Sequence, residues 1–263
     1  MAATRLDVLV CERGLAESRE RAKTLIMSGD VFVNGQRAEK PGTSYPEESD
    51  VEVRAAKQEF VSRGGYKLKK ALDTFGVSPQ GRICLDVGAS TGGFTDCLLQ
   101  RGAVKVFSVD VGYGQLAWSI RTDPRVVVLE RTNIRNATPE LIPGGPSLCT
   151  IDVSFISLRL VLPVVRTLLD PSGEVLCLIK PQFEAGREKV GKKGVVRDPA
   201  VHVEVLEHFV ENSRNAGFTV DGITFSPIRG PEGNIEYLGH LTSGGTEDVP
   251  DLKALVAASH EEL

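Results

Sequence analysis

The chain has 263 residues, 41% of them hydrophobic, and a formal net charge of −4. This length suits one large domain with a smaller one, and the composition is ordinary for a globular protein. No run of about 18 apolar residues occurs and the N-terminal residues lack an apolar signal core, so we expect a cytoplasmic protein without a membrane span. The five cysteines form no C-x-x-C pair and the four histidines form no ligand cluster, so neither a disulfide framework nor a metal site is predicted.

Residues 1–56 are predicted to form a small α+β domain. Apolar residues recur at helical spacing over 6–13, and a serine precedes a second predicted helix over 19–28; a glycine ends each helix. A strand over 31–37 runs into an Asn-Gly turn, and 50–54 alternates like an edge strand. The exposed face of the second helix is basic.

Residues 57–62 are expected to be a linker, followed by a larger domain at 63–245 and a polar tail at 246–263. The larger domain alternates apolar strands with helices, which indicates a parallel sheet covered by helices on both faces. Strands are expected at 83–87, 106–110, 126–129, 148–152, 175–179, 218–225 and 235–241. The predicted fold class of this domain is therefore α/β, with a doubly wound sheet.

A strand, a glycine turn and a helix follow one another over 82–99, which is typical of the first crossover of a doubly wound sheet. Small residues at Gly88, Ser90 and Gly92 would allow a ligand to lie directly on the backbone. The start of the helix offers free N–H groups. This stretch is the predicted nucleotide or cofactor site.

Acids end the first two strands of the domain. Asp86 is expected to face the crevice, where it holds either the turn or the amino-acid end of the ligand, and Asp110 is placed to bind a ribose diol. The NAD fingerprint G-x-G-x-x-G is not met, whereas D-x-G-x-x-x-G-G-F looks more like an S-adenosylmethionine site. The residues predicted to bind this cofactor are Asp86, Gly88, Ala89, Ser90, Gly92, Gly93, Asp110 and, near the adenine, Asn133.

Asp152 and Lys180 end two further strands above the same crevice, because ligands of open α/β sheets lie over the carboxyl ends of the strands. A lysine at the end of a buried strand needs a partner, since a desolvated ammonium is costly. The two residues are therefore either a structural ion pair or part of a catalytic site.

The N-terminal domain contains S-R-E-R-A-K-T-L-I at 18–26 and S-G-D-V-F-V-N-G at 28–35. Two helices followed by such a strand resemble the S4 RNA-binding module of ribosomal protein S4 and pseudouridine synthases. The resemblance implies that Arg19, Lys23 and Arg37 contact phosphates, which position RNA without reading its sequence. A solvated basic helix face is the alternative.

Six strings distributed over the chain resemble one family. They are S-R-G-G-Y-K-L (62–68), D-V-G-A-S-T-G-G-F-T (86–95), D-V-G-Y-G-Q-L (110–116), D-V-S-F-I-S (152–157), K-P-Q-F-E (180–184) and G-N-I-E-Y (233–237). They look like the TlyA family of S4-plus-FtsJ-like, S-adenosylmethionine-dependent rRNA cytidine-2′-O-methyltransferases, which are also named hemolysins. The resemblance implies a Rossmann-like methyltransferase sheet with an antiparallel last strand, preceded by a small α+β S4-like domain.

The FtsJ-like group is known for a Lys-Asp-Lys-Glu tetrad, which falls here on Lys67, Asp152, Lys180 and Glu236. A 2′-hydroxyl is a poor nucleophile and must lose its proton as it attacks, so a neutral lysine would be a suitable base. Lys180 is then the central base or oxyanion partner, and Lys67 favours its neutral form or steadies the alkoxide. Asp152 and Glu236 orient the two amines. Which lysine is neutral stays open.

Further contacts with ribosomal RNA or a ribosomal subunit are expected from Arg63 and from a glycine- and lysine-rich loop at 184–197. The loop contributes Lys189, Lys192 and Lys193, and it either closes over RNA or is simply solvated.

Two other functions stay open from the sequence alone. One is a noncatalytic RNA-binding or ribosome-assembly factor that keeps a relict cofactor fold. The other is a membrane-lytic protein, against which the lack of a signal, a spanning helix and long amphipathic strands argues. The target nucleotide and the oligomeric state are not determined at this level.

Overall fold

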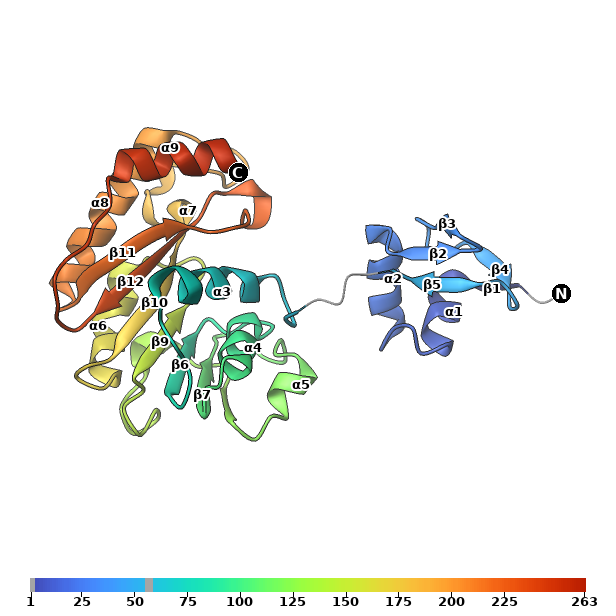
Figure 1. The fold of residues 1–263 in the computed structure, drawn as a ribbon, viewed down its shortest axis with the longest axis horizontal. Helices are drawn as coiled ribbons and strands as arrows, with labels where there is room; N and C mark the ends of the chain where they lie inside the picture. Colours follow the sequence, from blue (N-terminus) through green and yellow to red (C-terminus); the bar gives the residue numbers. More distant parts are fainter. Residues whose placement is uncertain (1–2, 55–58) are drawn as a thin grey trace. The chain divides into compact units, whose positions relative to one another are not determined.

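The computed structural model describes residues 3–54 and 59–263, and the chain divides into two units, Met1–Glu59 and Phe60–Leu263 (Figure 1). Phe60, which the sequence analysis assigned to the linker, packs in the core of the second unit. Its ring is 3% exposed and lies 5.2 Å from that of Tyr66, measured between centroids. Within the described ranges, no helix combines the length and the apolar character needed to cross a membrane.

The first unit is a small α+β fold. Its elements are β1 (Ala3–Arg5), α1 (Leu6–Glu12), α2 (Arg19–Ser28), β2 (Val31–Val33), β3 (Gln36–Arg37), β4 (Ser44–Pro46) and β5 (Val51–Val53). Strands β3, β2 and β5 form an antiparallel sheet, and β1 pairs with β4, a pairing the sequence analysis did not predict. Asn34 and Gly35 have positive φ, as an Asn-Gly hairpin turn requires. Leu6, Val10 and Ile26 are fully buried between the helices and the sheet.

The second unit is a doubly wound α/β fold, as predicted. Its strands are β6 (Ile83–Val87), β7 (Lys105–Val109), β8 (Val126–Leu129), β9 (Leu148–Ile151), β10 (Glu174–Ile179), β11 (Thr219–Phe225) and β12 (Tyr237–Thr242). They form one sheet in the order β11-β12-β10-β9-β6-β7-β8, and β12, the last strand in the chain, runs antiparallel to both neighbours. The order reverses between β6 and β9, so the topological switch point lies there.

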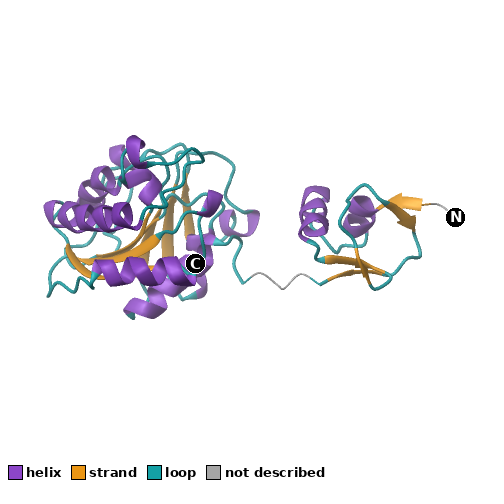
Figure 2. Ribbon diagram, turned by 90° about the horizontal axis from the view of Figure 1, so that it is seen from above, coloured by secondary structure: helices purple, strands orange, loops and turns teal. Residues whose placement is uncertain are grey.

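Helices cover both faces of this sheet (Figure 2). The α-helices are α3 (Gly64–Phe75), α4 (Gly93–Gln100), α5 (Trp118–Arg121), α6 (Leu158–Leu168), α7 (Pro181–Glu184), α8 (Pro199–Asn215) and α9 (Leu252–Glu262), and the 3₁₀ turns are η1 (Ile134–Asn136), η2 (Arg187–Lys189) and η3 (Pro231–Gly233). Helix α6, which the sequence analysis did not name, contains Pro163 in its interior, a residue that usually interrupts a helix. Helix α9 occupies most of the predicted polar tail and buries Val256 and Ser259.

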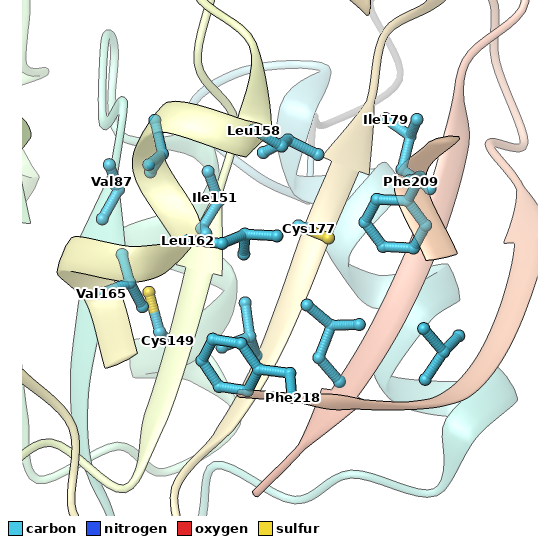
Figure 3. Packing of buried hydrophobic residues seen from close by; sticks show 14 of the residues in the cluster. Val87, Cys149, Ile151, Leu158, Leu162, Val165, Cys177, Ile179, Phe209 and Phe218 are labelled. Atoms are coloured by element: carbon cyan, nitrogen blue, oxygen red, sulfur yellow. The ribbon is translucent and has the colours of Figure 1, made fainter. Parts of the chain in front are cut away.

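The core of the second unit consists of two apolar clusters, one on each face of the sheet. In β10, Val175, Cys177 and Ile179 belong to the cluster beneath α6 and α8, part of which is drawn in Figure 3. Leu176 and Leu178 belong to the cluster beneath α3 and α4. This alternation follows from the period of two in a strand. Because both faces are buried, the strands read as continuous apolar runs and the polar residues collect at their ends.

Candidate active site

A cleft of about 1410 Å³ lies over the carboxyl ends of the central strands. Gly88, Asp110, Asp152 and Lys180 line it, and each directly follows one of the strands β6, β7, β9 and β10. Parallel strands bring their carboxyl ends to one edge of the sheet, so the residues that end the strands meet there. The tertiary structure therefore assembles the two halves of the predicted site, the glycine turn and the lysine pair, around one cavity.

Lys180 and Asp152 form an ion pair in this cleft. The Lys180 Nζ lies 2.6 Å from the Asp152 Oδ1 and donates a hydrogen bond of 3.0 Å to the Ser154 Oγ. Lys180 is 8% exposed, so its ammonium is largely removed from water and held by these two oxygens.

Lys67 and Glu236 form a second ion pair, with 2.5 Å between Nζ and Oε2, although 169 positions separate them in the sequence. Glu236 lies just before β12 and Lys180 just after β10, and these two strands are antiparallel neighbours in which Tyr237 pairs with Ile179. Glu236 and Lys180 therefore lie at the same edge of the sheet. Glu236 is fully buried and borders the cleft, whereas Lys67, from α3, is not among the cleft-lining residues. Seen from the cleft, Lys67 thus lies behind Glu236.

Gly88 begins the glycine turn and needs to be a glycine. Its φ is +86°, and a Cβ at this position would lie 2.3 Å from the backbone oxygen of Asp152. The absence of a side chain keeps β6 and β9 close at the switch point and leaves the turn open toward the cleft.

The other small residues of the turn differ in what they face. Ser90 borders the cleft and has a φ of +47°. Gly92 and Gly93 do not border it: a Cβ at Gly92 would lie 2.9 Å from a Leu116 methyl, and one at Gly93 2.1 Å from the Ser62 Oγ. These two glycines, predicted to bind cofactor, are explained by packing within the protein. Ala89 is buried and borders only a small adjoining cavity.

Asp86 does not face the crevice, contrary to the expectation from its place at the end of β6. It is fully buried and accepts hydrogen bonds from the Thr95 hydroxyl at 2.6 Å and the Thr150 hydroxyl at 2.9 Å. Burial raises the pKa of this carboxyl to about 6. Asp86 therefore ties α4 to β9 beneath the glycine turn.

Asp110 and Asn133, in contrast, border the cleft. One Asp110 oxygen accepts the N–H of Ser90 at 2.8 Å and the other accepts the N–H of Gly112 at 2.7 Å. Asn133 caps η1 by accepting the N–H of Arg135. A carboxylate oxygen can accept more than one hydrogen bond, so Asp110 keeps the capacity to bind a hydroxyl pair.

Two aromatic rings at the cleft were not singled out from the sequence. Phe155 borders the cleft, is 91% exposed and has a φ of +63°. Its ring centroid lies 5.0 Å from that of Phe183, which follows Lys180 on α7. An exposed phenylalanine has no sequence signature, because the same residue type is usually part of a core.

The residues predicted to bind RNA in the first unit are engaged within it. Arg19 donates to Asp7 at 3.0 Å, and Lys23 donates to Glu20 at 2.7 Å. The guanidinium of Arg37 lies against Gly29.

In the second unit, Arg63 donates to the backbone oxygen of Arg229 at 3.3 Å, and Lys189 pairs with Glu204. Lys192 and Lys193 are exposed and make no ion pair within the described part of the chain, and Lys193 borders the cleft. Lys192 and Lys193 therefore offer positive charge to a ligand, and so does Arg63, whose acceptor is an uncharged carbonyl.

The chain has extensive similarity to known proteins. Residues 60–242 match the model of the FtsJ-like methyltransferase family, and residues 4–51 match that of the S4 domain. YqxC of Bacillus subtilis is 57% identical and the alignment covers 98% of this chain and 95% of that protein. The 16S/23S rRNA (cytidine-2′-O)-methyltransferase TlyA of Mycobacterium tuberculosis is 44% identical over 98% of this chain and 97% of its own. A solved structure from Streptococcus thermophilus, 46% identical, covers 100% of this chain and 97% of its own with a TM-score of 0.77.

Proposed function

Because the chain belongs to the TlyA family of S4-domain, FtsJ-like methyltransferases, we propose that it methylates the ribose 2′-oxygen of a cytidine in ribosomal RNA. Its cofactor is S-adenosylmethionine, which supplies a methyl group on a positively charged sulfur. The observation that carries the proposal is the buried Lys180–Asp152 pair at the carboxyl edge of the sheet, beside the glycine turn.

The residues on the glycine-turn side of the cleft fit this cofactor. The turn at Gly88 has no room for a side chain, so backbone is presented to the ligand. Asp110 would bind the ribose hydroxyls with the hydrogen-bonding capacity that its two backbone donors leave unused. Ser90 and Asn133 would border the bound molecule, with Asn133 toward the adenine.

Lys180 would act on the attacking hydroxyl. As a neutral amine it would take the proton of the 2′-hydroxyl while the oxygen bonds to the methyl carbon and the bond between that carbon and the sulfur breaks, which leaves a neutral thioether. The resulting ammonium is then held by Asp152 and Ser154, the partners found in the structure. The cleft adds orientation, because an in-line displacement requires the nucleophile to be held in a narrow range of positions.

Lys67 would act through Glu236 rather than on the substrate. The ion pair neutralises a carboxylate that is fully buried beside the cleft, and an uncompensated charge there would be costly. With its charge balanced, Glu236 can accept a hydrogen bond from the reacting nucleotide or from Lys180.

Phe155 and Phe183 would receive the base of the target nucleotide. Proteins that recognise single-stranded or extruded RNA bases commonly stack them on aromatic rings. The exposure of Phe155 at the mouth of the cleft supports this role, since an exposed phenyl ring gains free energy when a base covers it. The S4 domain and Lys192 and Lys193 would supply contacts to phosphates.

The test is methyl transfer from labelled S-adenosylmethionine to ribosomal subunits that lack the modification, followed by nuclease mapping of the labelled ribose. Lys180→Ala should lower kcat by at least about 100-fold, because it removes the proton acceptor. Its Kd for S-adenosylmethionine, measured by calorimetry, should stay within about threefold of the wild type.

Lys253→Ala is the matched control, since it removes an exposed lysine at the start of α9. This variant should methylate at the wild-type rate. Wild-type activity in Lys180→Ala, or an equal loss of cofactor affinity, would contradict the assigned role. Absence of label on either subunit and on free ribosomal RNA would favour a noncatalytic function.

A further inference from the structure

The two loops at the lysine side of the cleft are joined by more than the ion pair. The first loop, residues 152–157, connects β9 to α6; the second begins at Lys180 and continues as α7. Lys180 is the N-cap of this single helical turn, and Phe183 and Glu184 lie within it. Lys180 contacts Asp152, and Phe183 contacts Phe155.

Glu184 makes the third contact. One carboxylate oxygen accepts the hydroxyl of Ser157 at 2.6 Å and the other accepts the backbone N–H of Leu158 at 2.8 Å. Ser157 is the N-cap of α6 and Leu158 its first residue. The first N–H groups of a helix have no partner inside it, and a negative charge is favoured there. Glu184 therefore fixes the end of the loop that carries Asp152 and Phe155.

The loop needs such a constraint because of Phe155. A φ of +63° is unfavourable for a phenylalanine, and such a conformation persists only where the surroundings hold it. The phenyl ring is 91% exposed, so its own burial does not hold it. The fixed points on either side are Asp152, tied to Lys180, and the Ser157–Leu158 backbone, tied to Glu184.

We propose that Glu184 is a positioning residue for the target nucleotide: it holds the loop at 152–157 so that Phe155 presents its ring to the base. This inference rests on the proposed methyltransferase function. Glu184 does not border the cleft, so it would act through the loop.

The experiment measures methylation of ribosomal subunits by Glu184→Ala and Glu184→Gln. The alanine variant should raise KM for RNA and lower kcat, with a combined loss in kcat/KM of about 10- to 100-fold, because small displacements of reacting groups are costly. Its Kd for S-adenosylmethionine should be unchanged. Glutamine can still accept the N–H of Leu158, so Glu184→Gln should recover activity to within about threefold.

Asp170→Ala separates positioning from loss of stability. Asp170 lies just beyond the other end of α6 and accepts the same two kinds of donor, the N–H and the hydroxyl of Ser172, at 2.9 and 2.6 Å. Its removal should lower the melting temperature while kcat/KM stays at the wild-type value, which would show that a loss of stability at α6 does not by itself reduce methylation.

A double-mutant cycle with Phe155→Ala tests whether Glu184 affects kcat/KM through Phe155. If Glu184 acts by placing Phe155, Glu184→Ala should cost less than about threefold in the Phe155→Ala background. Ser157→Ala removes one of the two hydrogen bonds to Glu184, so it should lower kcat/KM by a smaller factor than Glu184→Ala does. This loss too should shrink in the Phe155→Ala background, which keeps the test valid should Glu184→Ala fail to fold.

Unchanged kcat/KM in Glu184→Ala and Ser157→Ala, or losses that simply add to that of Phe155→Ala, would overturn the role of Glu184 while the wild-type activity stands. Absence of methylation by the wild-type protein would overturn the proposed function, and this inference with it.

Discussion

At the scale of single residues, burial separates the two acids that end β6 and β7. Asp86 has no exposed surface and accepts two threonine hydroxyls, whereas Asp110 borders the cleft and accepts two backbone N–H groups. Both were predicted to bind cofactor. For Asp110 this role stays a prediction for a residue that the structure places at the cleft, and for Asp86 the structure indicates a part in holding the turn from below.

The raised pKa of Asp86 leads to a prediction about pH. The folded protein keeps the Asp86 proton up to a pH of about 6, whereas an aspartate in an unfolded chain loses it near pH 4. Between these values the folded state binds more protons, so this residue makes wild-type stability fall as the pH rises from 4 to 6. Asp86→Asn cannot titrate, so its unfolding free energy relative to the wild type should increase by up to about 3 kcal/mol across that window.

Urea unfolding of both proteins at pH 4.5 and 7.5 measures this difference, and comparison with the wild type cancels the other titrating groups. Calorimetry on the same variant should give an unchanged Kd for S-adenosylmethionine, since Asp86 does not border the cleft. A large loss of cofactor affinity in a stably folded Asp86→Asn would restore the original prediction that Asp86 binds the ligand.

At the scale of elements, the approach of β9 to the glycine turn sets the geometry of the site. Gly88 combines a positive φ with a close contact to the Asp152 backbone, which no side-chain rearrangement can relieve. Gly88→Ala should therefore displace β9 relative to β6, and both halves of the cleft depend on that spacing. We expect loss of cofactor affinity by more than about tenfold together with a stability cost above the 1–2 kcal/mol of left-handed strain alone.

Gly76→Ala is a matched control for that strain. Gly76 ends α3 with a φ of +68°, and a Cβ there would meet nothing within 4 Å. This variant should cost about 1–2 kcal/mol in unfolding free energy and leave the Kd for S-adenosylmethionine unchanged. Equal effects of the two substitutions on cofactor binding would show that backbone strain, and not the contact with β9, is what matters.

At the scale of the whole molecule, each unit has its own apolar core. Ten buried residues among those that the structure describes form the core of the first unit, and the second unit begins with Phe60, whose ring occupies the space beside Gly65. A protein that starts at Phe60 should therefore fold. Its Kd for S-adenosylmethionine should match that of the full chain, because the residues that border the cleft all belong to the second unit.

The same truncated protein should bind ribosomal RNA at least about tenfold more weakly than the full chain, with a weaker dependence on salt concentration, because phosphate contacts are lost. Filter binding at two salt concentrations measures both quantities. Undiminished RNA affinity would count against a docking role for the S4 domain and would shift that role to residues such as Lys192 and Lys193.

The sequence by itself determined the fold class and the candidate residues of the glycine turn. These features are local: a strand with both faces buried reads as an apolar run, and a tight turn requires glycine whatever lies around it. The S4-like and methyltransferase domains and the tetrad followed instead from the resemblance to the TlyA family. The roles assigned to Lys67, Asp152, Lys180 and Glu236 stay predictions, as do those of the RNA-binding residues.

Only the tertiary structure decided which polar residues meet the cleft. It paired Lys67 with Glu236 across 169 positions, buried Asp86, filled the space above Gly92 and Gly93 with protein atoms, and exposed Phe155. Sequence patterns repeat over a few residues, whereas these contacts depend on the order and register of strands and on how helices pack over them. That is why the chemistry of a strand-end residue became defined only once its neighbours in space were known.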